Sequence, residues 1–428
     1  MLHTKLPHAA LGLVLSVGCA SQPLPATHDC PSAPVAQSLP GPSASTLAPQ
    51  SLNPAASSRG LLRDRSGRAL SAEADDTPPS LRPWIGSLTD NGRGGSGLQA
   101  RFDSELAGGR DVQVSLDASL HRALEAAFVD VEQAAGVVLR VDDGGVLALY
   151  STLPHTSHAG LERRHLATSW PDACGSAAKP FTALAALAAG VSKPDTTYEC
   201  SGKLKVGRRE FRCWAEHGPL DLAHALALSD NIYFFQLARL LSVDGISKAQ
   251  HGFGLGEAVA LFPEAPVGWI PSSEALEGDG RKPDDATKLS QAIGHNIAVT
   301  PLQLARGYAA LASGKLTEPS FGAAASRATE ISASYAQFLP VIRAALRRTV
   351  TDQDGTAHVA GTAPDVSGKT GTAQRAFSRA MPNAPDSGWF AGWAPANNPR
   401  IAFAFRAEGL SGRQVAERVL KAMEAAGR

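Results

Sequence analysis

Apolar residues along the chain gather in runs that stop at glycine, proline or polar positions, and the spacing within each run predicts a helix or a strand. The alanine-rich run SAAKPFTALAALAAG, from Ser176, predicts a helix that ends at Gly190. A second helix is predicted by NIYFFQLARLL, which begins at Asn231. Residues 363–374, APDVSGKTGTAQ, predict a strand whose glycines allow close approach of a ligand. Residues 411–428 predict an amphipathic helix that packs on the sheet, with an apolar face of Val415, Val419, Leu420 and Met423.

The amino-terminal stretch, MLHTKLPHAALGLVLSVGCASQP, has a different pattern. It carries one lysine, Lys5, then the uncharged residues 9–17 and small residues before Cys19. This order is typical of a secretory signal, and LSVGC is similar to a bacterial lipobox, which leaves the cysteine as the lipid-bearing first residue. Because Ser16 stands where such boxes usually carry leucine, ordinary secretion and a retained anchor stay open as alternatives. We expect residues 1–19 to be a lipoprotein-type signal peptide, with lipidation at Cys19.

Residues 20–58 are rich in Pro, Ser and Ala and contain almost no large apolar side chain. Such a segment cannot bury enough surface to offset its ordering entropy, so it predicts a disordered linker. A linker of this composition reaches roughly tens of ångströms. We therefore expect an exported, lipid-anchored bacterial protein whose folded part faces the periplasm.

The charges of the chain are balanced, with 40 Lys and Arg against 40 Asp and Glu. No long basic block is present, so there is no field that would recruit nucleic acid or an acidic lipid surface. We expect no nucleic-acid partner, and contact with the membrane only through the amino-terminal lipid.

Two of the five cysteines, Cys200 and Cys213, flank the segment SGKLKVGRREFR. A turn at Gly207 would fold this segment into a hairpin and bring the two sulfur atoms together. In an exported protein this arrangement predicts a disulfide, with two small buried thiols as the alternative. The chain has no CxxC pair, and the histidines of HTSHAGLERRH are scattered through a predicted loop, so we expect no metal site and no cofactor.

The first candidate for chemistry is the pair Ser176 and Lys179, which lie one turn apart on the predicted helix. A serine hydroxyl needs a neighbour that accepts its proton, and a lysine in an apolar setting can have its pKa lowered enough to do so. The alternative is an exposed pair at a helix end. Because a Ser-x-x-Lys match is expected about once by chance in a chain of this composition, the pair alone decides little.

Two further motifs follow in order: Ser229, Asp230 and Asn231 at the start of the second helix, then a Lys-Thr-Gly triplet from Lys369. The triplet is expected only about 0.06 times by chance. Ser-x-x-Lys, Ser-Asp-Asn and Lys-Thr-Gly in this order are the motifs of serine β-lactamases and penicillin-binding proteins. From about residue 60 to 410, segments such as RDRSGRAL, EHGPLDLAHALALSDN and GWFAGWAP also resemble successive pieces of class B penicillin-binding proteins.

The resemblance implies an α+β fold of the β-lactamase/transpeptidase type. A five-stranded antiparallel sheet flanked by helices would meet an all-helical subdomain, with the active site in the groove between them. Residues 59–135 would be a shortened remnant of the amino-terminal pedestal, and residues 136–428 the penicillin-binding transpeptidase domain. The implied activity is a peptidoglycan D,D-transpeptidase, with stem peptides, β-lactams and cell-wall synthesis proteins as partners.

The resemblance also implies a role for each motif residue. Ser176 would be the nucleophile, Lys179 its base, Ser229 a proton relay and Lys369 a positive charge that helps to hold Lys179 neutral. Asn231 would bind the substrate amide. The Thr370 and Thr372 hydroxyls would bind the substrate carboxylate, and Gly371 between them would be part of the same substrate-binding strand. The backbone N–H groups of Ser176 and Thr372 would form the oxyanion hole.

Several positions depart from the family pattern. Cys174-Gly175 stands in place of Pro-Gly, IGHN in place of Ile-Gly-Gln-Gly, and Gln99 in place of a glutamate. The Glu-x-x-x-Asn of class A β-lactamases is missing, because the only asparagine between the second and third motifs is Asn296, with Ala292 four residues before it. Another type of β-lactamase, a D-alanyl carboxypeptidase, and a non-catalytic wall-binding or β-lactam-sensing module remain the alternatives.

Overall fold

The structure is a computed structural model that describes residues 59–152, 165–322, 326–359, 364–373 and 385–427. The predicted signal peptide, lipidation at Cys19 and linker lie outside the described residues. The chain from Ser57 onward forms one compact unit. Among the described helices, none has the length and apolar character needed to cross a membrane.

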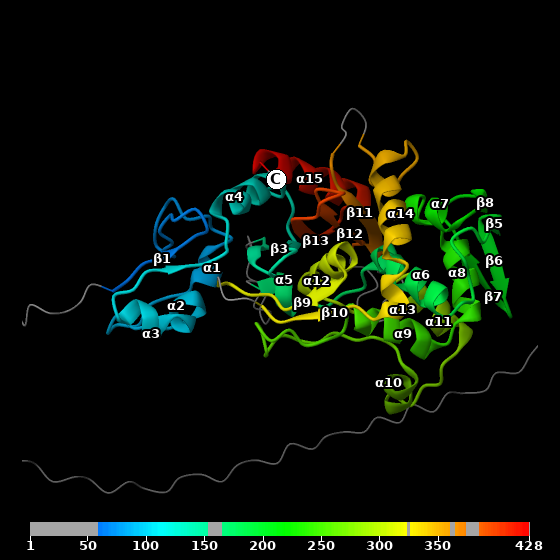
Figure 1. Ribbon diagram of the computed structural model, residues 1–428, viewed down its shortest axis with the longest axis horizontal. Coiled ribbons are helices and arrows are strands. Elements are labelled where there is room, and N and C mark those ends of the chain that lie inside the picture. Colours follow the sequence, from blue (N-terminus) through cyan, green and yellow to red (C-terminus); the bar gives the residue numbers. More distant parts are fainter. Residues whose placement is uncertain (1–58, 153–164, 323–325, 360–363, 374–384, 428) are drawn as a thin grey trace, which may run out of the picture. The chain divides into compact units, whose positions relative to one another are not determined.

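A five-stranded antiparallel sheet forms the centre of this unit, in the order β11-β12-β13-β3-β4 (Figure 1). Its strands are β3 Ala134–Arg140, β4 Val146–Ser151, β11 Ser367–Ala373, β12 Ser387–Ala394 and β13 Ile401–Glu408. Every neighbouring pair is antiparallel. β11, the strand predicted from the triplet segment, lies at one edge of the sheet. The predicted sheet is therefore confirmed.

The two faces of the sheet belong to two separate hydrophobic cores, because successive side chains of a strand point to opposite sides. On one face, Phe403 and Phe405 of β13 pack with α4 (Ala118–Ala127) and α15 (Gly412–Ala425). On the other face, the small side chains Ala402 and Ala404 share a core with α12 (Pro301–Ser313). The predicted carboxyl-terminal helix is α15, and its apolar residues pack in the first core as expected.

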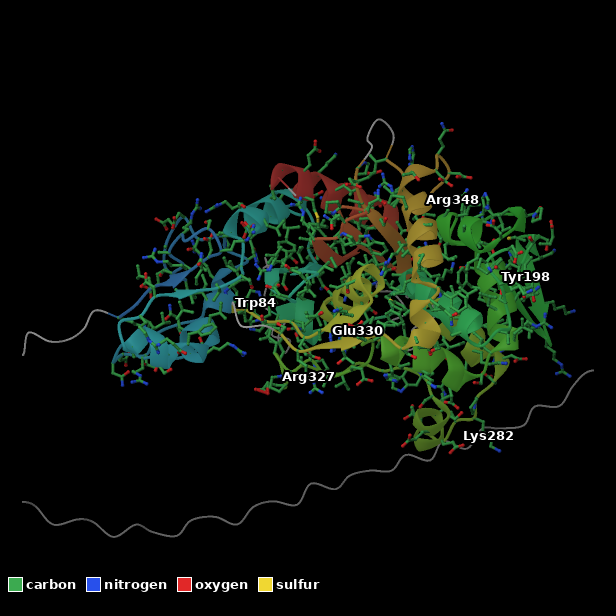
Figure 2. The ribbon with its side chains drawn as sticks, in the orientation of Figure 1. Trp84, Tyr198, Lys282, Arg327, Glu330 and Arg348 are labelled. Atoms are coloured by element: carbon green, nitrogen blue, oxygen red, sulfur yellow. The ribbon has the colours of Figure 1, made fainter. Side chains whose placement is uncertain are left out.

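A mainly helical region adjoins the β11 edge. It contains the 3-10 turn Gly175–Ala178, α6 Lys179–Ala188, α7 Leu222–Ala227, α8 Asn231–Leu240, α9 Val243–Gly252, α10 Ser273–Gly278, α11 Asp285–Ala292, α13 Ala333–Ala336 and α14 Leu339–Thr351. Two small antiparallel pairs lie beside α8: β5 Tyr198–Cys200 with β8 Gly218–Leu220, and β6 Lys203–Val206 with β7 Arg209–Arg212. Tyr198, labelled in Figure 2, packs on Tyr233 of α8 with ring centroids 5.1 Å apart. The expected helical subdomain is therefore present.

The residues before the sheet add short elements to the same unit. They are β1 Leu62–Arg63, α1 Arg82–Ile85, α2 Gly97–Arg101, α3 Asp103–Ala107 and β2 Val112–Gln113. Three short elements from later in the chain complete the described part: α5 Leu166–Ser169, β9 Lys315–Thr317 and β10 Ala328–Glu330. Leu81, Trp84 and Ile85 are buried in the same core as α12, so this part packs directly on the larger body.

Candidate active site

The predicted nucleophile, Ser176, lies on a 3-10 turn that leads directly into α6. Gly175 adopts a positive φ of 52°, and its N–H donates to the Gly294 carbonyl at 3.0 Å. A Cβ on Gly175 would lie 2.4 Å from the carbonyl oxygen of Thr372, so only glycine fits beside β11 here. On the other side of the turn, Tyr308 Oη donates to the Ala177 carbonyl at 2.9 Å. The serine is thus held on a turn that touches the edge strand of the sheet.

Lys179, the first residue of α6, is fully buried and joins the first motif to the second. Its Nζ donates to the Ser229 carbonyl at 2.7 Å and to Asn231 Oδ1 at 2.8 Å, and lies 3.4 Å from Ser229 Oγ. Burial lowers the pKa of Lys179 to about 8, although the nearby Asp230 and two cysteine thiols favour the charged amine. An amine with this pKa is partly neutral near pH 7 and can accept a proton.

The Ser-Asp-Asn corner is a tight turn in front of α8. Ser229 has φ 59°, and it is the only residue other than glycine with a positive φ among the described residues. Such a conformation costs about 1–3 kcal/mol and persists where neighbouring contacts enforce it. Here Asp230 caps α8 by accepting from Tyr233 N–H at 2.6 Å, and Asn231 Nδ2 donates to the Arg212 carbonyl at 3.1 Å. These contacts turn both Ser229 and Asn231 toward Lys179.

The third motif lies on β11, on the sheet side of the same place. Lys369 is fully buried and donates to the Thr370 carbonyl at 3.1 Å; burial and then the nearby Lys179 hold its pKa well below the usual value. Thr370 Oγ1 donates to Thr356 Oγ1 at 2.6 Å. A Cβ on Gly371 would lie 2.2 Å from the Cys174 carbonyl, so this strand touches the serine turn where it carries no side chain. The structure therefore brings all three motifs together.

Burial is the first cause of the lowered pKa of both lysines, and repulsion from Lys179 is a second cause for Lys369. The resemblance had implied that Lys369 helps to keep Lys179 neutral. Since both ammonium groups are buried, the apolar surroundings already disfavour the charged form of each.

His295 is a site residue that the sequence analysis noted only as a departure from the family pattern. Its neighbour Gly294 contacts Gly175, and its imidazole hydrogen-bonds the backbone of Thr372. Burial first and Lys179 second lower the pKa of His295, while the bond to Thr372 opposes this shift. The signal that could have located it was the histidine in IGHN.

Arg406 of β13 supports the segment that leads to the nucleophile. This buried guanidinium lies 4.3 Å from the ring centroid of Trp170 and pairs with Asp172 at 3.2 Å. It also pairs with Glu408 at 3.1 Å and donates to Ser387 Oγ at 3.0 Å. The pattern of apolar residues in β13 gave no signal for this contact, because it depends on residues far apart in the chain.

The two cysteines of the predicted disulfide are free thiols in the structure, which corrects that prediction. The hairpin does bring them together, but each sulfur also faces His217 or Asp230: Cys200 Sγ lies 3.6 Å from His217 Nδ1, and Cys213 Sγ lies 3.2 Å from Asp230 Oδ2. The donor atoms of these four residues all lie within 4.8 Å of one another. Two thiolates, an imidazole and a carboxylate are ligands that zinc accepts. The expectation of no metal site overlooked this group, because His217 and Asp230 do not lie in a recognisable metal motif.

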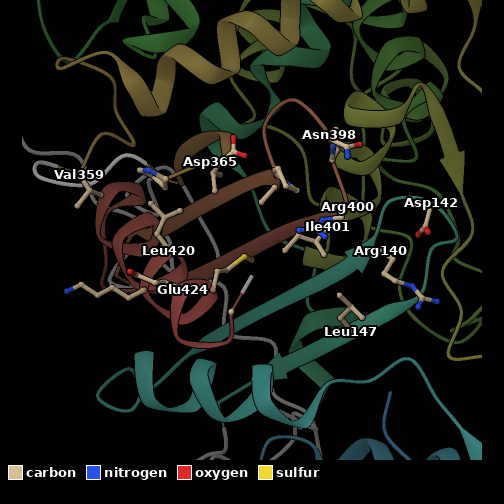
Figure 3. A pocket seen from close by; sticks show the side chains of 18 of the residues that line it. Arg140, Asp142, Leu147, Val359, Asp365, Asn398, Arg400, Ile401, Leu420 and Glu424 are labelled. Atoms are coloured by element: carbon tan, nitrogen blue, oxygen red, sulfur yellow. The ribbon is translucent and has the colours of Figure 1, made fainter. Parts of the chain in front are cut away.

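A separate hollow of about 880 Å³ lies between α15 and the ends of the sheet strands. Figure 3 shows Arg140, Asp365, Leu420 and Glu424 among the side chains that line it. The lining mixes both charge signs with apolar residues and includes none of the three motifs. Its volume therefore does not mark the site of the predicted chemistry.

Comparisons with known proteins agree with this geometry. The family model described as the penicillin binding protein transpeptidase domain matches residues 134–423. Two peptidoglycan D,D-transpeptidases are similar: MrdA of Salmonella typhimurium is 27% identical over 49% of this chain and 38% of its own length, and the probable transpeptidase PenA of Neisseria flavescens is 28% identical over 76% and 81%. This chain thus spans well under half the length of MrdA.

Solved structures give the same result. The PBP2 of Pseudomonas aeruginosa, in complex with WCK 5153, is 26% identical with a TM-score of 0.71, over 87% of this chain and 96% of that one. A transpeptidase domain from Eggerthella lenta, 24% identical with a TM-score of 0.69, shares the fold. The family model covers more than half of the chain and the three motifs meet at one place, so the chain belongs to the penicillin-binding protein transpeptidase domain family, and the similarity to MrdA, PenA and PBP2 agrees with the class B type that the longer resemblance predicted.

Proposed function

We propose that this protein is a serine-type peptidoglycan D,D-transpeptidase that β-lactams also acylate. The observation that carries the proposal is the position of Lys179. It lies one turn after Ser176, is fully buried, has a pKa lowered to about 8, and hydrogen-bonds Ser229 and Asn231 of the second motif.

In this mechanism, neutral Lys179 accepts the proton of the Ser176 hydroxyl as the oxygen attacks the penultimate D-alanine carbonyl of a stem peptide. The terminal D-alanine leaves after Ser229 relays a proton to its amine. The resulting acyl-enzyme is then attacked by the amine of a second stem peptide. A β-lactam would acylate the same serine oxygen, but its leaving amine stays attached to the acyl group because the two belong to one opened ring.

The remaining motif residues bind and orient the substrate. The backbone N–H groups of Ser176 and Thr372 stabilise the developing oxyanion, each by about 3 kcal/mol. Asn231 binds the substrate amide, while Thr370 and Thr372 bind its carboxylate. Lys369 completes this wall of the site, and binding of an anionic substrate beside it would favour its protonated form, since a nearby negative charge opposes the lowering of its pKa by burial and by Lys179. Support comes from the close approach of the serine turn to β11 at Gly175 and Gly371.

We further infer that the protein is exported, with residues 1–19 as the signal peptide, Cys19 as the lipidated residue and residues 20–58 as the linker. Residues 59–135 would be the pedestal remnant and residues 136–428 the catalytic domain. Relatives suggest cell-wall synthesis proteins as partners, because one similar solved structure is a complex of PBP2 and MreC from Helicobacter pylori and another is a peptidoglycan synthase complex. We expect the protein to need no cofactor for its chemistry.

The test is intact-mass spectrometry of the purified protein over time after addition of penicillin, with Ser176→Ala as the control. A covalent adduct that forms on the wild type alone and persists for many minutes is expected. An adduct that disappears while the drug is consumed would instead indicate a β-lactamase. Absence of an adduct on folded protein would exclude the acylation chemistry and leave a wall-binding module.

A D-alanyl carboxypeptidase would give the same stable adduct, so a second assay is needed. The protein is incubated with a pentapeptide stem substrate and a stem-peptide amine acceptor, and the products are separated by mass. Cross-linked dimer is the expected product. Tetrapeptide without dimer would identify a carboxypeptidase.

A further inference from the structure

A row of cross-strand neighbours lies under the segment that carries the predicted nucleophile. One residue from each strand of the five-stranded sheet belongs to the row, and each lies directly opposite the next in the register: Gly371, Trp389, Arg406, Ala135 and Ser151. Side chains directly opposite each other on neighbouring strands point to the same face of a sheet. The row therefore forms one line across the face that the serine turn touches.

The chain from α5 to the serine turn follows this row. At the β4 end, Ser151 Oγ accepts from the Ala167 N–H of α5 at 3.2 Å. At the β11 end, a Cβ on Gly371 would lie 2.2 Å from the Cys174 carbonyl and 3.1 Å from the Ala177 nitrogen. The segment thus crosses this face of the sheet and is in contact with the row at both ends.

Arg406 is the charged member of the row and holds the middle of that segment. Its guanidinium carbon lies 4.3 Å from the ring centroid of Trp170, and its Nη2 lies 3.2 Å from Asp172 Oδ2. The other oxygen of the same carboxylate accepts from the Ala173 N–H at 2.9 Å. The side chain of Arg406 is 2% exposed and that of Asp172 is 14% exposed, so salt screens this ion pair little. The pair therefore fixes the peptide that leads into the serine turn.

The position of this peptide matters because the proposed oxyanion hole lies across a gap. One of its two donors, the Ser176 N–H, follows Asp172 by four residues, and the other, the Thr372 N–H, belongs to β11. The spacing of the two donors depends on how closely the serine turn approaches β11. Asp172 N–H also donates to the Val299 carbonyl at 3.0 Å, so Asp172 is held by its backbone on one side and by its carboxylate on the other.

A second carboxylate pairs with the same nitrogen of Arg406 but holds nothing of the serine segment. Glu408 Oε1 lies 3.1 Å from Arg406 Nη2, and the side chain of Glu408 is as exposed as that of Asp172. Glu408 is the last residue of β13, and its N–H donates to the Gln133 carbonyl beside β3 at 2.9 Å. The two carboxylates share one cation, and Asp172 is the one that joins it to the nucleophile.

We propose that Arg406 is a positioning residue for acylation: through Asp172 it holds the serine turn against β11 and so sets the spacing of the two N–H groups that bind the oxyanion. The effect on acylation rests on the proposed function, whereas the hold on the serine turn does not. Because the oxyanion forms only as the serine attacks, loss of this ion pair slows the acylation step and leaves the noncovalent binding of penicillin unchanged.

The test variant is Asp172→Asn in the full purified protein, because an amide of the same size keeps an acceptor for the Ala173 N–H but removes the charge that faces Arg406. Acylation by a fluorescent penicillin is followed over a range of concentrations, which separates the dissociation constant from the acylation rate constant. We expect the rate constant to fall about tenfold and the dissociation constant to stay within about twofold of the wild type. The pH midpoint of the rate should not move, because Lys179 is bonded to the Ser-Asp-Asn corner.

Glu408→Gln is the matched control, because it removes an equally exposed charge from the same guanidinium without a change in the serine segment. Both variants should lose similar stability in a denaturant titration, and Glu408→Gln should keep the wild-type acylation rate constant. Equal slowing by the two variants would overturn the proposal, because charge balance around Arg406 would then explain the effect. A wild-type rate constant in Asp172→Asn, or a loss that lies wholly in the dissociation constant, would also overturn it.

Arg406→Lys is the second variant and decides the matter if Asp172→Asn does not fold. Lysine keeps the positive charge but lacks the planar group that lies on Trp170 and bonds several partners at once. We expect a lower acylation rate constant with an unchanged dissociation constant, as for Asp172→Asn. A wild-type rate constant in this variant would show that the geometry of the guanidinium does not position the turn.

Hydrogen exchange of the peptide that spans the serine turn tests its position without acylation. The Gly175 N–H donates to the Gly294 carbonyl at 3.0 Å, so its exchange reports how firmly the turn is held. Exchange in this peptide should be faster in Asp172→Asn than in Glu408→Gln. If the wild type is not acylated, the proposed function fails, and this comparison still decides whether the ion pair holds the turn. Equal exchange in the two variants would show that it does not.

Discussion

The two walls of the candidate active site are held in different ways. On the sheet wall, Lys369, Thr370 and Thr372 lie on β11, which pairs with β12 from Ser367 to Ala373. On the helical wall, Ser229 and Asn231 lie on a short turn with a residue in a strained conformation, fixed by a helix cap and by a cysteine sulfur. A ladder of backbone bonds survives most side-chain changes, whereas a turn held by side chains depends on each of them. Acylation should therefore be more sensitive to loss of a polar side chain on the helical wall, and to an added side-chain volume on the sheet wall.

Lys179 is the residue that joins the walls, so its removal should have the largest effect. Lys179→Ala removes the proton acceptor beside Ser176 and the donor to Ser229 and Asn231. We expect acylation by a fluorescent penicillin to slow by about a thousandfold, within the range for loss of a general base. The exposed Lys193→Ala is the matched control and should acylate at the wild-type rate. A Lys179→Ala protein that acylates normally would remove the proposed base from the mechanism.

Gly371→Ala tests the sheet wall by volume alone. The new methyl would lie 2.2 Å from the Cys174 carbonyl, so β11 or the serine turn must shift. We expect a loss of about 1–3 kcal/mol in the free energy of unfolding, measured by denaturant titration, because added volume in a packed site is costly. Acylation should also slow, since the shift separates the strand from Ser176.

Gly278→Ala is the matched control, because a Cβ there meets no atom within 4 Å and the residue is far from the site in sequence. Its stability should stay close to that of the wild type. Equal stability of the two variants would mean that β11 does not press on the serine turn as the structure indicates.

The comparison also shows what the sequence could predict. The motifs and the wider family resemblance were sufficient to predict the fold, because each motif is local and the family joins them in one way. The structure brings Ser176, Lys179, Ser229 and Lys369 to one place, and their catalytic roles stay predictions. The strand at β11 and the helix at α15 followed from glycine positions and from an apolar face. The sequence thus predicted the elements of each wall, but not the contacts between the two walls.

What the sequence did not show depends on contacts between residues far apart. Cys200 and Cys213 were correctly placed near each other, but His217 and Asp230, which make them part of a larger group, carry no metal spacing in the sequence. Arg406 lies in a strand that otherwise appears purely apolar, and its partner Asp172 precedes it by more than two hundred residues. Such contacts are set by how β13 and the serine segment pack, which local patterns do not encode.

The pH dependence of acylation tests whether the helical wall sets the proton acceptor. The pKa of Lys179 is lowered to about 8, chiefly by burial, and the neutral amine is the active form. At pH 7 about one tenth of the molecules would carry neutral Lys179. The acylation rate should therefore rise about tenfold between about pH 7 and pH 9, with the curve flattening above pH 8. Rates with a stable β-lactam should be measured from pH 6 to 9, with unfolding followed in parallel. A flat profile over this range would place the pKa of the base elsewhere.

The smallest expected effect concerns His295, which supports the sheet wall from the helical side. Its imidazole hydrogen-bonds the backbone of Thr372, whose N–H is proposed to bind the oxyanion. His295→Ala removes this bond and should slow acylation about fivefold, the equivalent of roughly 1 kcal/mol for a single hydrogen bond. His295→Gln can still donate to the backbone and should recover most of the rate. Because burial and Lys179 hold the pKa of His295 below its usual value, the ring stays neutral above pH 7, and neither variant should move the midpoint near pH 8. A shifted midpoint would show that His295 shares the titration of Lys179, and the two walls would then be coupled by charge as well as by contact.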